Sequence, residues 1–242
     1  MSKSLEGKIA LVTGASRGIG YATAKAFAAE GAHIIAVART VGGLEELDDE
    51  IQKAGGSATL VPLDLKDGDG IDRMGKSIYD RWGKLDILLG NAGVLGGITP
   101  LGHISPKEFD EVMAVNVTAN WRLLRSMDPL LNQSTAGRVL MVSSGAARSR
   151  RPFWGAYSIS KAALETMAVT YAREMAHTKI KTLIINPGPL RTAMRAKAIP
   201  GEDPATLKTP YDLAPDLVRL AGDNTSENGV MWDFPSQQFI EV

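Results

Sequence analysis

Residues 13–20 read Thr13-Gly14-Ala15-Ser16-Arg17-Gly18-Ile19-Gly20, and this stretch decides the fold of the chain. It follows the apolar run Ile9 to Val12 and precedes an alanine-rich helical pattern from Tyr21 to Ala29. The pattern therefore predicts a strand, a tight glycine turn and the start of a helix. Glycines let a backbone approach a phosphate closely, and the amides and dipole at a helix N-terminus favour its negative charge. A nucleotide with a pyrophosphate is the expected ligand.

The composition excludes several other classes of protein. The 242 residues are 44% hydrophobic, as in ordinary globular cores, and no run approaches the roughly 18 apolar residues of a membrane span. The 27 basic and 27 acidic residues cancel, so we expect neither a nucleic acid nor a membrane as a partner. The chain has no cysteine, and its first residues lack the apolar core of a signal peptide, which favours a cytoplasmic location.

Strand-like apolar runs alternate with helical patterns along the whole chain. Near-continuous apolar strands of this kind predict a parallel sheet covered on both faces, and we expect one doubly wound α/β Rossmann domain over residues 1–242 with a mainly parallel, seven-stranded sheet. The expected strands are Ile9–Val12, His33–Ala38, Ala58–Leu63, Leu85–Leu89, Gly137–Val142, Ile180–Ile185 and Val230–Phe234, and the expected helices include Tyr21–Ala29, Ile71–Trp82, Ser105–Leu131 and Gly155–Ala176.

The end of the second expected strand bears on the choice of cofactor. In dinucleotide-binding folds an acidic residue about 20 positions beyond the glycines accepts the ribose 2′-hydroxyl. Here that position reads Ala38-Arg39-Thr40, with no carboxylate. A guanidinium suits a 2′-phosphate, and Arg17 in the glycine turn could reach the same group. The sequence therefore predicts NADP(H) in preference to NAD(H).

A second chemical signal lies at the start of the helix expected from Gly155. Tyr157 and Lys161 are four residues apart, so their side chains share one helix face. An ammonium about 4 Å from a phenol would lower the phenol's pKa from near 10 towards neutrality, although burial would remove part of that effect. The pair is thus a candidate for acid-base chemistry. The three histidines lack metal-ligand spacing, so we predict no metal site.

Taken together, these segments resemble the short-chain dehydrogenase/reductase family over nearly the whole chain. The glycine turn matches the family's turn, and Asn91-Ala92-Gly93 matches its motif after the fourth strand. Ser144 stands 13 residues before Tyr157 at the place of the family's serine, with Ser143 as the less favoured candidate. The resemblance implies the catalytic residues Asn116, Ser144, Tyr157 and Lys161, and the cofactor-binding residues Gly14, Ser16, Arg17, Gly18, Ile19, Gly20, Arg39, Asp64, Leu65, Asn91, Ala92, Gly93, Tyr157, Lys161, Pro187, Gly188 and Thr192.

The resemblance implies hydride transfer between a nicotinamide and a carbonyl or secondary alcohol. Ser144 would hydrogen-bond the carbonyl oxygen, and Tyr157 would donate the proton. Lys161 would lower the pKa of Tyr157 and hold the nicotinamide ribose, while Asn116 would anchor a water that relays protons to Lys161. Assembly into a homodimer or homotetramer through the helices at 105–131 and 155–176 is also implied.

The substrate is left open by the sequence. Residues 188–211, in particular Met194 to Tyr211, are expected to form a lid over a pocket for a small carbonyl or alcohol. A 3-oxoacyl-carrier-protein reductase is an alternative, although Leu130 to Thr135 lacks the basic cluster expected for docking acyl carrier protein. A catalytically inactive nucleotide-binding regulator is a further alternative. The chain also closes with Gly229 to Pro235 instead of the family's usual aspartate-glycine-glycine ending.

Overall fold

The computed structural model describes residues 3–242 and contains one sheet whose strand order is β3-β2-β1-β4-β5-β6-β7-β8. The first seven strands in the chain pair in parallel, and β8 pairs antiparallel to β7. The strands are β1 (Ile9–Thr13), β2 (His33–Ala38), β3 (Ser57–Pro62), β4 (Ile87–Gly90), β5 (Arg138–Val142), β6 (Lys181–Asn186), β7 (Met231–Asp233) and β8 (Gln238–Ile240). The doubly wound class is confirmed.

The sheet has one strand more than the seven that the sequence predicts. The additional strand, β8, follows β7 through a turn in which Gln237 has a φ of 56°. It spans three residues, too few to produce a readable alternation of apolar and polar side chains. It pairs with β7 and is the last strand at that edge of the sheet.

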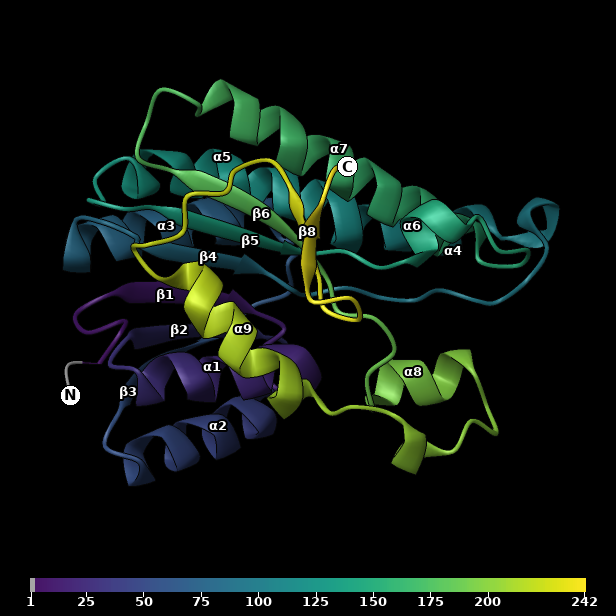
Figure 1. Ribbon diagram of the computed structural model, residues 1–242, viewed down its shortest axis with the longest axis horizontal. Coiled ribbons are helices and arrows are strands. Elements are labelled where there is room, and N and C mark those ends of the chain that lie inside the picture. Colours follow the sequence, from purple (N-terminus) through teal and green to yellow (C-terminus); the bar gives the residue numbers. More distant parts are fainter. Residues whose placement is uncertain (1–2) are drawn as a thin grey trace.

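Helices cover both faces of the sheet (Figure 1). One layer holds α1 (Gly18–Ala29), α2 (Val41–Lys53) and α9 (Pro210–Ala221), and the other holds α3 (Gly68–Trp82), α5 (Ala119–Leu131) and α7 (Gly155–Glu174). The shorter helices are α4 (Pro106–Met113), α6 (Ala146–Ser149) and α8 (Ala193–Ala198), with single 3₁₀ turns at Leu101–His103 and Pro204–Thr206.

Alternating side chains of the strands divide the core into two clusters. Ile34 and Ala36 of β2 pack in the cluster that contains Phe27 of α1, whereas Ile35 and Val37 pack in the cluster on the opposite face. Successive side chains of a strand point to opposite faces, so a strand between two helical layers must be apolar at every position. The continuous apolar runs of the sequence follow from this arrangement.

The helix expected over Ser105–Leu131 forms as α4 and α5, which a π-helical turn joins without a break. It begins as predicted, since the Ser105 side chain accepts a hydrogen bond from the Glu108 amide at 3.3 Å and Pro106 occupies the first turn. Residues Ala114–Thr118 then form a wider π-helical turn. Asn116 lies in this turn with its side chain fully buried. The predicted helix from Ser105 to Leu131 is therefore confirmed, and the π turn within it is a feature that local periodicity does not encode.

The helices also bear on the membrane question. Among residues 3–242, none of the helices combines the length and the apolar composition needed to cross a bilayer.

Candidate active site

A cleft of about 1200 Å³ opens at the carboxyl ends of the strands, where ligands bind in this class of fold. It receives side chains from loops that lie far apart in the sequence. Of the residues that the sequence predicts for the site, those that line it are Gly14, Ser16, Arg17, Gly18, Ile19, Arg39, Asp64, Leu65, Asn91, Ala92, Gly93, Ser144, Tyr157, Lys161, Pro187, Gly188 and Thr192. Gly20 and Asn116 are the two predicted residues that do not line the cleft.

The glycine turn fits the close approach of a phosphate. Gly14 and Gly18 have φ values of 65° and 61°, a region that favours glycine. Gly20 lies beneath the turn, where an added Cβ would stand 2.4 Å from the carbonyl oxygen of Gly14. Helix α1 begins at Gly18, and the side chain of its N-cap residue, Arg17, makes no capping hydrogen bond. The first amides of α1 are therefore directed at the cleft without a side-chain acceptor.

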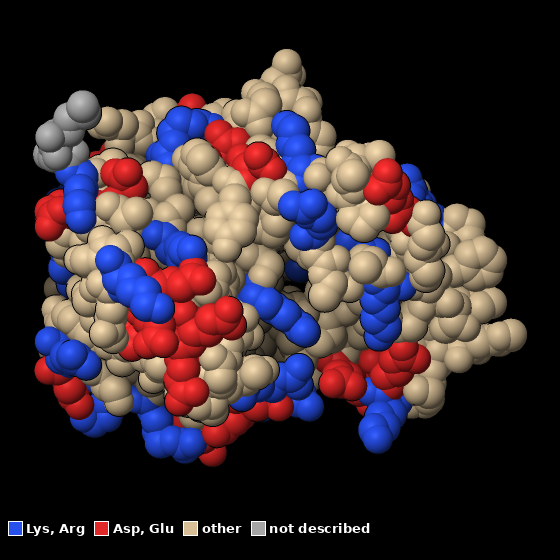
Figure 2. Space-filling view, turned by 90° about the horizontal axis from the view of Figure 1, so that it is seen from below, with Lys and Arg blue, Asp and Glu red and all other residues tan. Residues whose placement is uncertain are grey.

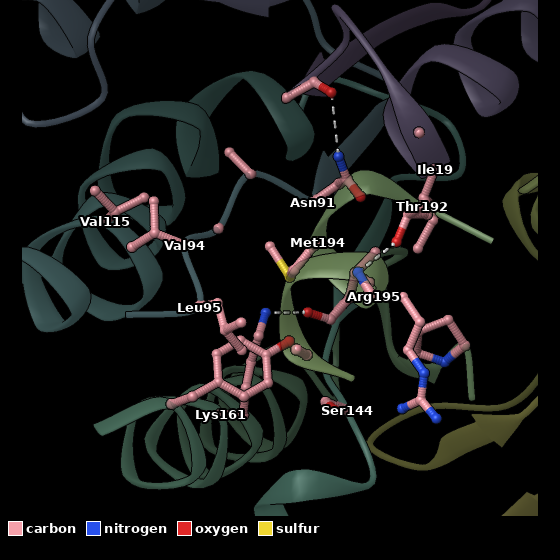
Figure 3. Close-up of a pocket in the computed structure, with 18 of the residues that line it drawn as sticks. Ile19, Asn91, Val94, Leu95, Val115, Ser144, Lys161, Thr192, Met194 and Arg195 are labelled. Carbon is pink, nitrogen blue, oxygen red and sulfur yellow. Dashed lines mark hydrogen bonds between the residues drawn. The ribbon is translucent and has the colours of Figure 1, made fainter. Parts of the chain in front are cut away.

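Thr13 and Asn91 join the glycine turn to the loop after β4. The Thr13 hydroxyl accepts hydrogen bonds from the amides of Asn91 and Ala92 at 2.9 and 3.0 Å. In return the Asn91 side chain donates to the Thr13 carbonyl at 2.8 Å. Figure 3 labels Asn91 at this wall of the cleft. Two walls of the cleft are thereby fixed to each other by backbone and side-chain hydrogen bonds.

Arg17 and Arg39 lie at the exposed edge of the cleft, one in the glycine turn and one directly after β2. Within the part of the chain that the structure describes, neither guanidinium has a carboxylate within ion-pair distance. Figure 2 shows basic side chains around a hollow on the face seen from below, and acidic side chains gathered to one side of it. Two free guanidiniums at this edge suit a phosphate.

Tyr157 and Lys161 share the inner face of α7, as their spacing predicts. Their exposed fractions are 8% and 3%. The Lys161 ammonium lies 5.7 Å from the centroid of the Tyr157 ring and donates a hydrogen bond to the Val142 carbonyl at 2.7 Å (Figure 3). A helix end, a strand end and a titratable pair thus meet in the cleft.

Burial changes the pKa of both side chains and corrects one expectation. The pKa of Tyr157 is raised by burial, and the nearby Ser144 hydroxyl only partly opposes this effect. Burial lowers the pKa of Lys161 to about 8, although the negative charge of Glu165 opposes that shift. The expectation that the pKa of Tyr157 falls towards neutrality is therefore wrong for this geometry, because burial disfavours the charged phenolate.

The structure places Ser144 and Ser143 differently. Ser144 follows β5 in a loop that lines the cleft, and its hydroxyl accepts a hydrogen bond from the Ala146 amide at 3.2 Å. Ser143 is 2% exposed, and its hydroxyl donates to Glu165 at 2.6 Å. Of the two hydroxyls, that of Ser144 lies beside Tyr157.

Asn116 lies behind the cleft and supports its wall. Its side-chain oxygen accepts from the Val94 amide at 2.8 Å, and its side-chain nitrogen donates to the Val94 carbonyl and to Ser160, each at 2.9 Å. A Cβ placed on Gly93 would lie 3.2 Å from the Asn116 side-chain oxygen and 3.7 Å from the Lys161 nitrogen. The side chains of Asn116 and Lys161 therefore both lie next to Gly93, and that of Asn116 is already bonded to the loop.

The segment after β6 meets the C-terminal hairpin. Gly188 has a φ of 64°, and a Cβ there would lie 2.5 Å from the Pro235 ring. Asn186 donates to Asp233 at 2.5 Å, and Thr192 caps α8 by accepting from the Arg195 amide at 3.2 Å. The unusual C-terminal segment is thus packed against the proline-glycine turn that lines the cleft.

Two further residues of this region, Glu165 and Trp154, were not predicted from the sequence. Glu165 lies one helical turn beyond Lys161 on the same face of α7, and the spacing 157, 161 and 165 could have identified it. Trp154 lines the cleft, and its ring makes an edge contact with the ring of Tyr157 at a centroid distance of 6.1 Å. Its place directly before the helix was the available signal.

Over residues 3–242 the structure brings together no group of three or more His, Asp or Glu side chains that could hold a metal ion.

The parts of the site fit a dinucleotide: a glycine turn with free helix amides, two guanidiniums at the edge, and a tyrosine-lysine pair opposite. Comparison with known proteins agrees. The family model described as short chain dehydrogenase matches residues 8–203. The oxidoreductase YciK of Escherichia coli (strain K12) is 38% identical over 95% of this chain and 92% of its own length.

Two solved structures are similar in both fold and sequence. A short chain dehydrogenase from Shigella flexneri 2a str. 301, complexed with NADP, has a TM-score of 0.92 and 37% identity, and the match covers 96% of this chain and 99% of that one. Another from Escherichia coli CFT073, complexed with NADPH, has a TM-score of 0.90 and 37% identity over 96% and 98% of the two chains.

Proposed function

This chain belongs to the short chain dehydrogenase family, and from that premise we propose that it is an NADP(H)-dependent oxidoreductase that interconverts a carbonyl and a secondary alcohol. The observation that carries the proposal is the meeting of Ser144, Tyr157 and Lys161 in one cleft with the glycine turn. Lysine side chains are rarely buried, and Lys161 is only 3% exposed, so its position in the cleft favours a functional role.

In the proposed reaction each residue of the cleft has a distinct role. A reduced nicotinamide, when bound, would supply the hydride for the carbonyl carbon. Ser144 donates a hydrogen bond to the carbonyl oxygen, and Tyr157 gives its proton to that oxygen as the C–O bond becomes single. Lys161 holds positive charge beside Tyr157 and stabilises the phenolate that forms. Asn116 positions the loop at Val94 and the helix at Ser160 around the pair.

Preference for NADP(H) over NAD(H) rests on charge. Arg17 in the glycine turn and Arg39 at the end of β2 border the cleft, and Asp64, which follows the neighbouring strand β3, is already paired with Lys66 at 3.7 Å. A 2′-phosphate there gains two charge-assisted contacts, whereas a free 2′-hydroxyl finds no carboxylate directly after β2. The NADP and NADPH named in the two similar structures agree with this preference.

Residues 188–211 act in this proposal as the substrate lid. Met194 and Lys197 of α8 line the cleft opposite Leu95. Figure 3 labels Met194 and Leu95. Arg195 holds the segment together through two hydrogen bonds of 2.6 Å to Glu202. The lid therefore covers the cleft as a folded unit, with an apolar side chain facing the reacting groups.

The experiment that tests the function is turnover by Tyr157→Phe. A panel of ketones, quinones, sugars and acyl thioesters is screened for NADPH oxidation, and the variant is compared on every accepted compound. We expect turnover to fall by roughly 10³-fold, because the proton donor is lost, with NADPH affinity within about twofold of the parent. Equal rates for variant and parent would reject the assignment.

The same screen decides between the alternatives. Turnover confined to acyl thioesters would favour a 3-oxoacyl-carrier-protein reductase, and NADPH binding with no turnover of any compound would favour a regulator that keeps the fold. The intact serine, tyrosine and lysine favour the enzyme.

We also propose that the protein is a homodimer or homotetramer built through the helical segments at 105–131 and 155–176. Trp121 of α5 and Ile159 of α7 are 49% and 41% exposed, and large apolar side chains at such positions suit an interface. Light scattering should give at least twice the mass of one chain at micromolar concentration, and a monomer would contradict the proposal. A cytoplasmic location stays a prediction of the sequence.

A further inference from the structure

Helix α7 carries a third charged side chain on its inner face. Glu165 is 5% exposed and lies four residues after Lys161, which lies four residues after Tyr157. Residues at this spacing stand one above another on a helix. A carboxylate loses much hydration when it is buried, so it persists in the interior only with partners that replace the lost water.

Glu165 has two such partners, both from the segment that carries Ser144. The Ser143 hydroxyl donates a hydrogen bond of 2.6 Å to one carboxylate oxygen. The Nε of Arg148, on α6, stands 3.5 Å from the other oxygen. The residues on either side of Ser144 are thus held by one carboxylate of the neighbouring helix.

Three successive residues at the end of β5 and just after it contact α7, although not in the order of the helix. Lys161 donates to the carbonyl of Val142, and Glu165 accepts from the side chain of Ser143, the next residue. The residue after that is Ser144, whose hydroxyl lies beside Tyr157. Three successive residues of the strand end therefore meet three successive turns of the helix, and two of these contacts involve charged groups.

We propose that Glu165 is a positioning residue for the reaction, which holds Ser144 against Tyr157 through Ser143 and keeps the positive charge on Lys161. The inference rests on the proposed function, because it assigns Glu165 a part in the same proton transfer. Glu165 itself touches neither substrate nor cofactor in this scheme. It acts through Ser143 and through the charge of Lys161.

The charged groups near Tyr157 and Lys161 indicate how Glu165 affects the charge of Lys161. Arg148 from α6 faces Glu165 and also Asp233 of β7. From the π turn the nearest group is the neutral Asn116, and on α4 the carboxylate of Glu108 is bonded to the Gly97 amide. Burial lowers the pKa of Lys161 to about 8, and Glu165 is the charge that opposes the shift. Loss of the Glu165 charge should therefore release the Lys161 proton at a lower pH.

Two substitutions separate the contact from the charge. Glu165→Gln keeps an oxygen that can accept from Ser143 but removes the charge, whereas Ser143→Ala removes the hydrogen bond and keeps the charge. Glu174→Gln, on an exposed position of the same helix, is the matched control. The measurements are kcat for carbonyl reduction from pH 6 to 10, NADPH affinity by fluorescence, and the melting temperature of each variant.

In the profile of kcat against pH, we expect the basic limb of Glu165→Gln to lie about one pH unit lower than that of the parent, because Lys161 loses its proton at a lower pH. Ser143→Ala should lower kcat roughly fivefold, whereas the pH of the basic limb and the NADPH affinity should stay as in the parent. Glu174→Gln should match the parent in every measurement. A purely structural carboxylate would lower the melting temperature without moving the limb.

A Glu165→Gln profile that superimposes on the parent's would overturn the inference, as would a uniform loss of rate with the limb unmoved. If Glu165→Gln does not fold, Ser143→Ala decides: reduced kcat at unchanged NADPH affinity supports the inference, and unchanged kcat rejects it. Failure of the proposed function is distinguished by Tyr157→Phe, which would then turn over as fast as the parent.

Discussion

The two walls of the cleft are built on different physical principles. The wall formed by β1, α1 and β2 presents backbone amides, glycines with positive φ and two exposed guanidiniums. The wall formed by β5 and α7 presents Tyr157 and Lys161, both less than a tenth exposed, with Glu165 behind them. Changes to the first wall should alter binding, and changes to the second should alter chemistry and the pH dependence of stability.

The sharpest test of this difference is Lys161→Met, which keeps an unbranched side chain but removes the charge. We expect kcat to fall by on the order of 10³-fold, because Tyr157 then transfers its proton without a neighbouring cation. NADPH affinity should fall much less, as measured by fluorescence titration. Similar losses in kcat and in affinity would contradict the assignment of binding to one wall and of chemistry to the other.

The same substitution tests the burial of the charge through stability. Lys161 has a pKa of about 8 in the folded chain and near 10.5 unfolded, so the unfolded state binds more protons between these values. The free energy of unfolding of the parent should therefore rise, relative to Lys161→Met, by about 3 kcal/mol as the pH goes from below 8 to above 10.5. Urea unfolding at several pH values measures it, and a constant difference would refute the buried charge.

On the opposite wall Gly20→Ala tests the role of the backbone. The added Cβ would stand 2.4 Å from the Gly14 carbonyl oxygen, so the turn must shift. We expect NADPH affinity to weaken by roughly 30-fold, equivalent to about 2 kcal/mol, with kcat at saturating NADPH nearly unchanged. Gly42→Ala in α2 is the control, because an added Cβ there meets nothing within 4 Å. Equal affinities for the two variants would contradict the role of the turn.

The smallest expected effect belongs to the exposed arginines. Arg39→Asp should weaken NADPH and favour NADH, and shift the ratio of their kcat/KM values by roughly tenfold or more, because a carboxylate repels the 2′-phosphate and accepts from a 2′-hydroxyl. Arg73→Asp on α3 makes the same charge change away from the cleft and should leave the ratio unchanged. A parent that already prefers NADH would reject the cofactor proposal.

The sequence by itself determined the doubly wound fold and the inventory of the cleft. Glycine turns, apolar runs and the spacing of Tyr157 and Lys161 are local patterns, and their meaning depends on residues within about one helical turn or one strand. All but two of the predicted site residues line the cleft for that reason. The sequence also showed that Arg39, and no carboxylate, directly follows the second strand.

Only the tertiary structure decided the π turn at Asn116, the eighth strand, the direction of the pKa change at Tyr157, and the contact of Glu165 with Ser143. Each depends on groups brought together from segments that local periodicity treats as independent, such as the loop at Val94 and the helix at Ser160. Burial is the physical reason: it fixes which polar groups must find partners and which charges lose their water, and a linear pattern does not contain that information.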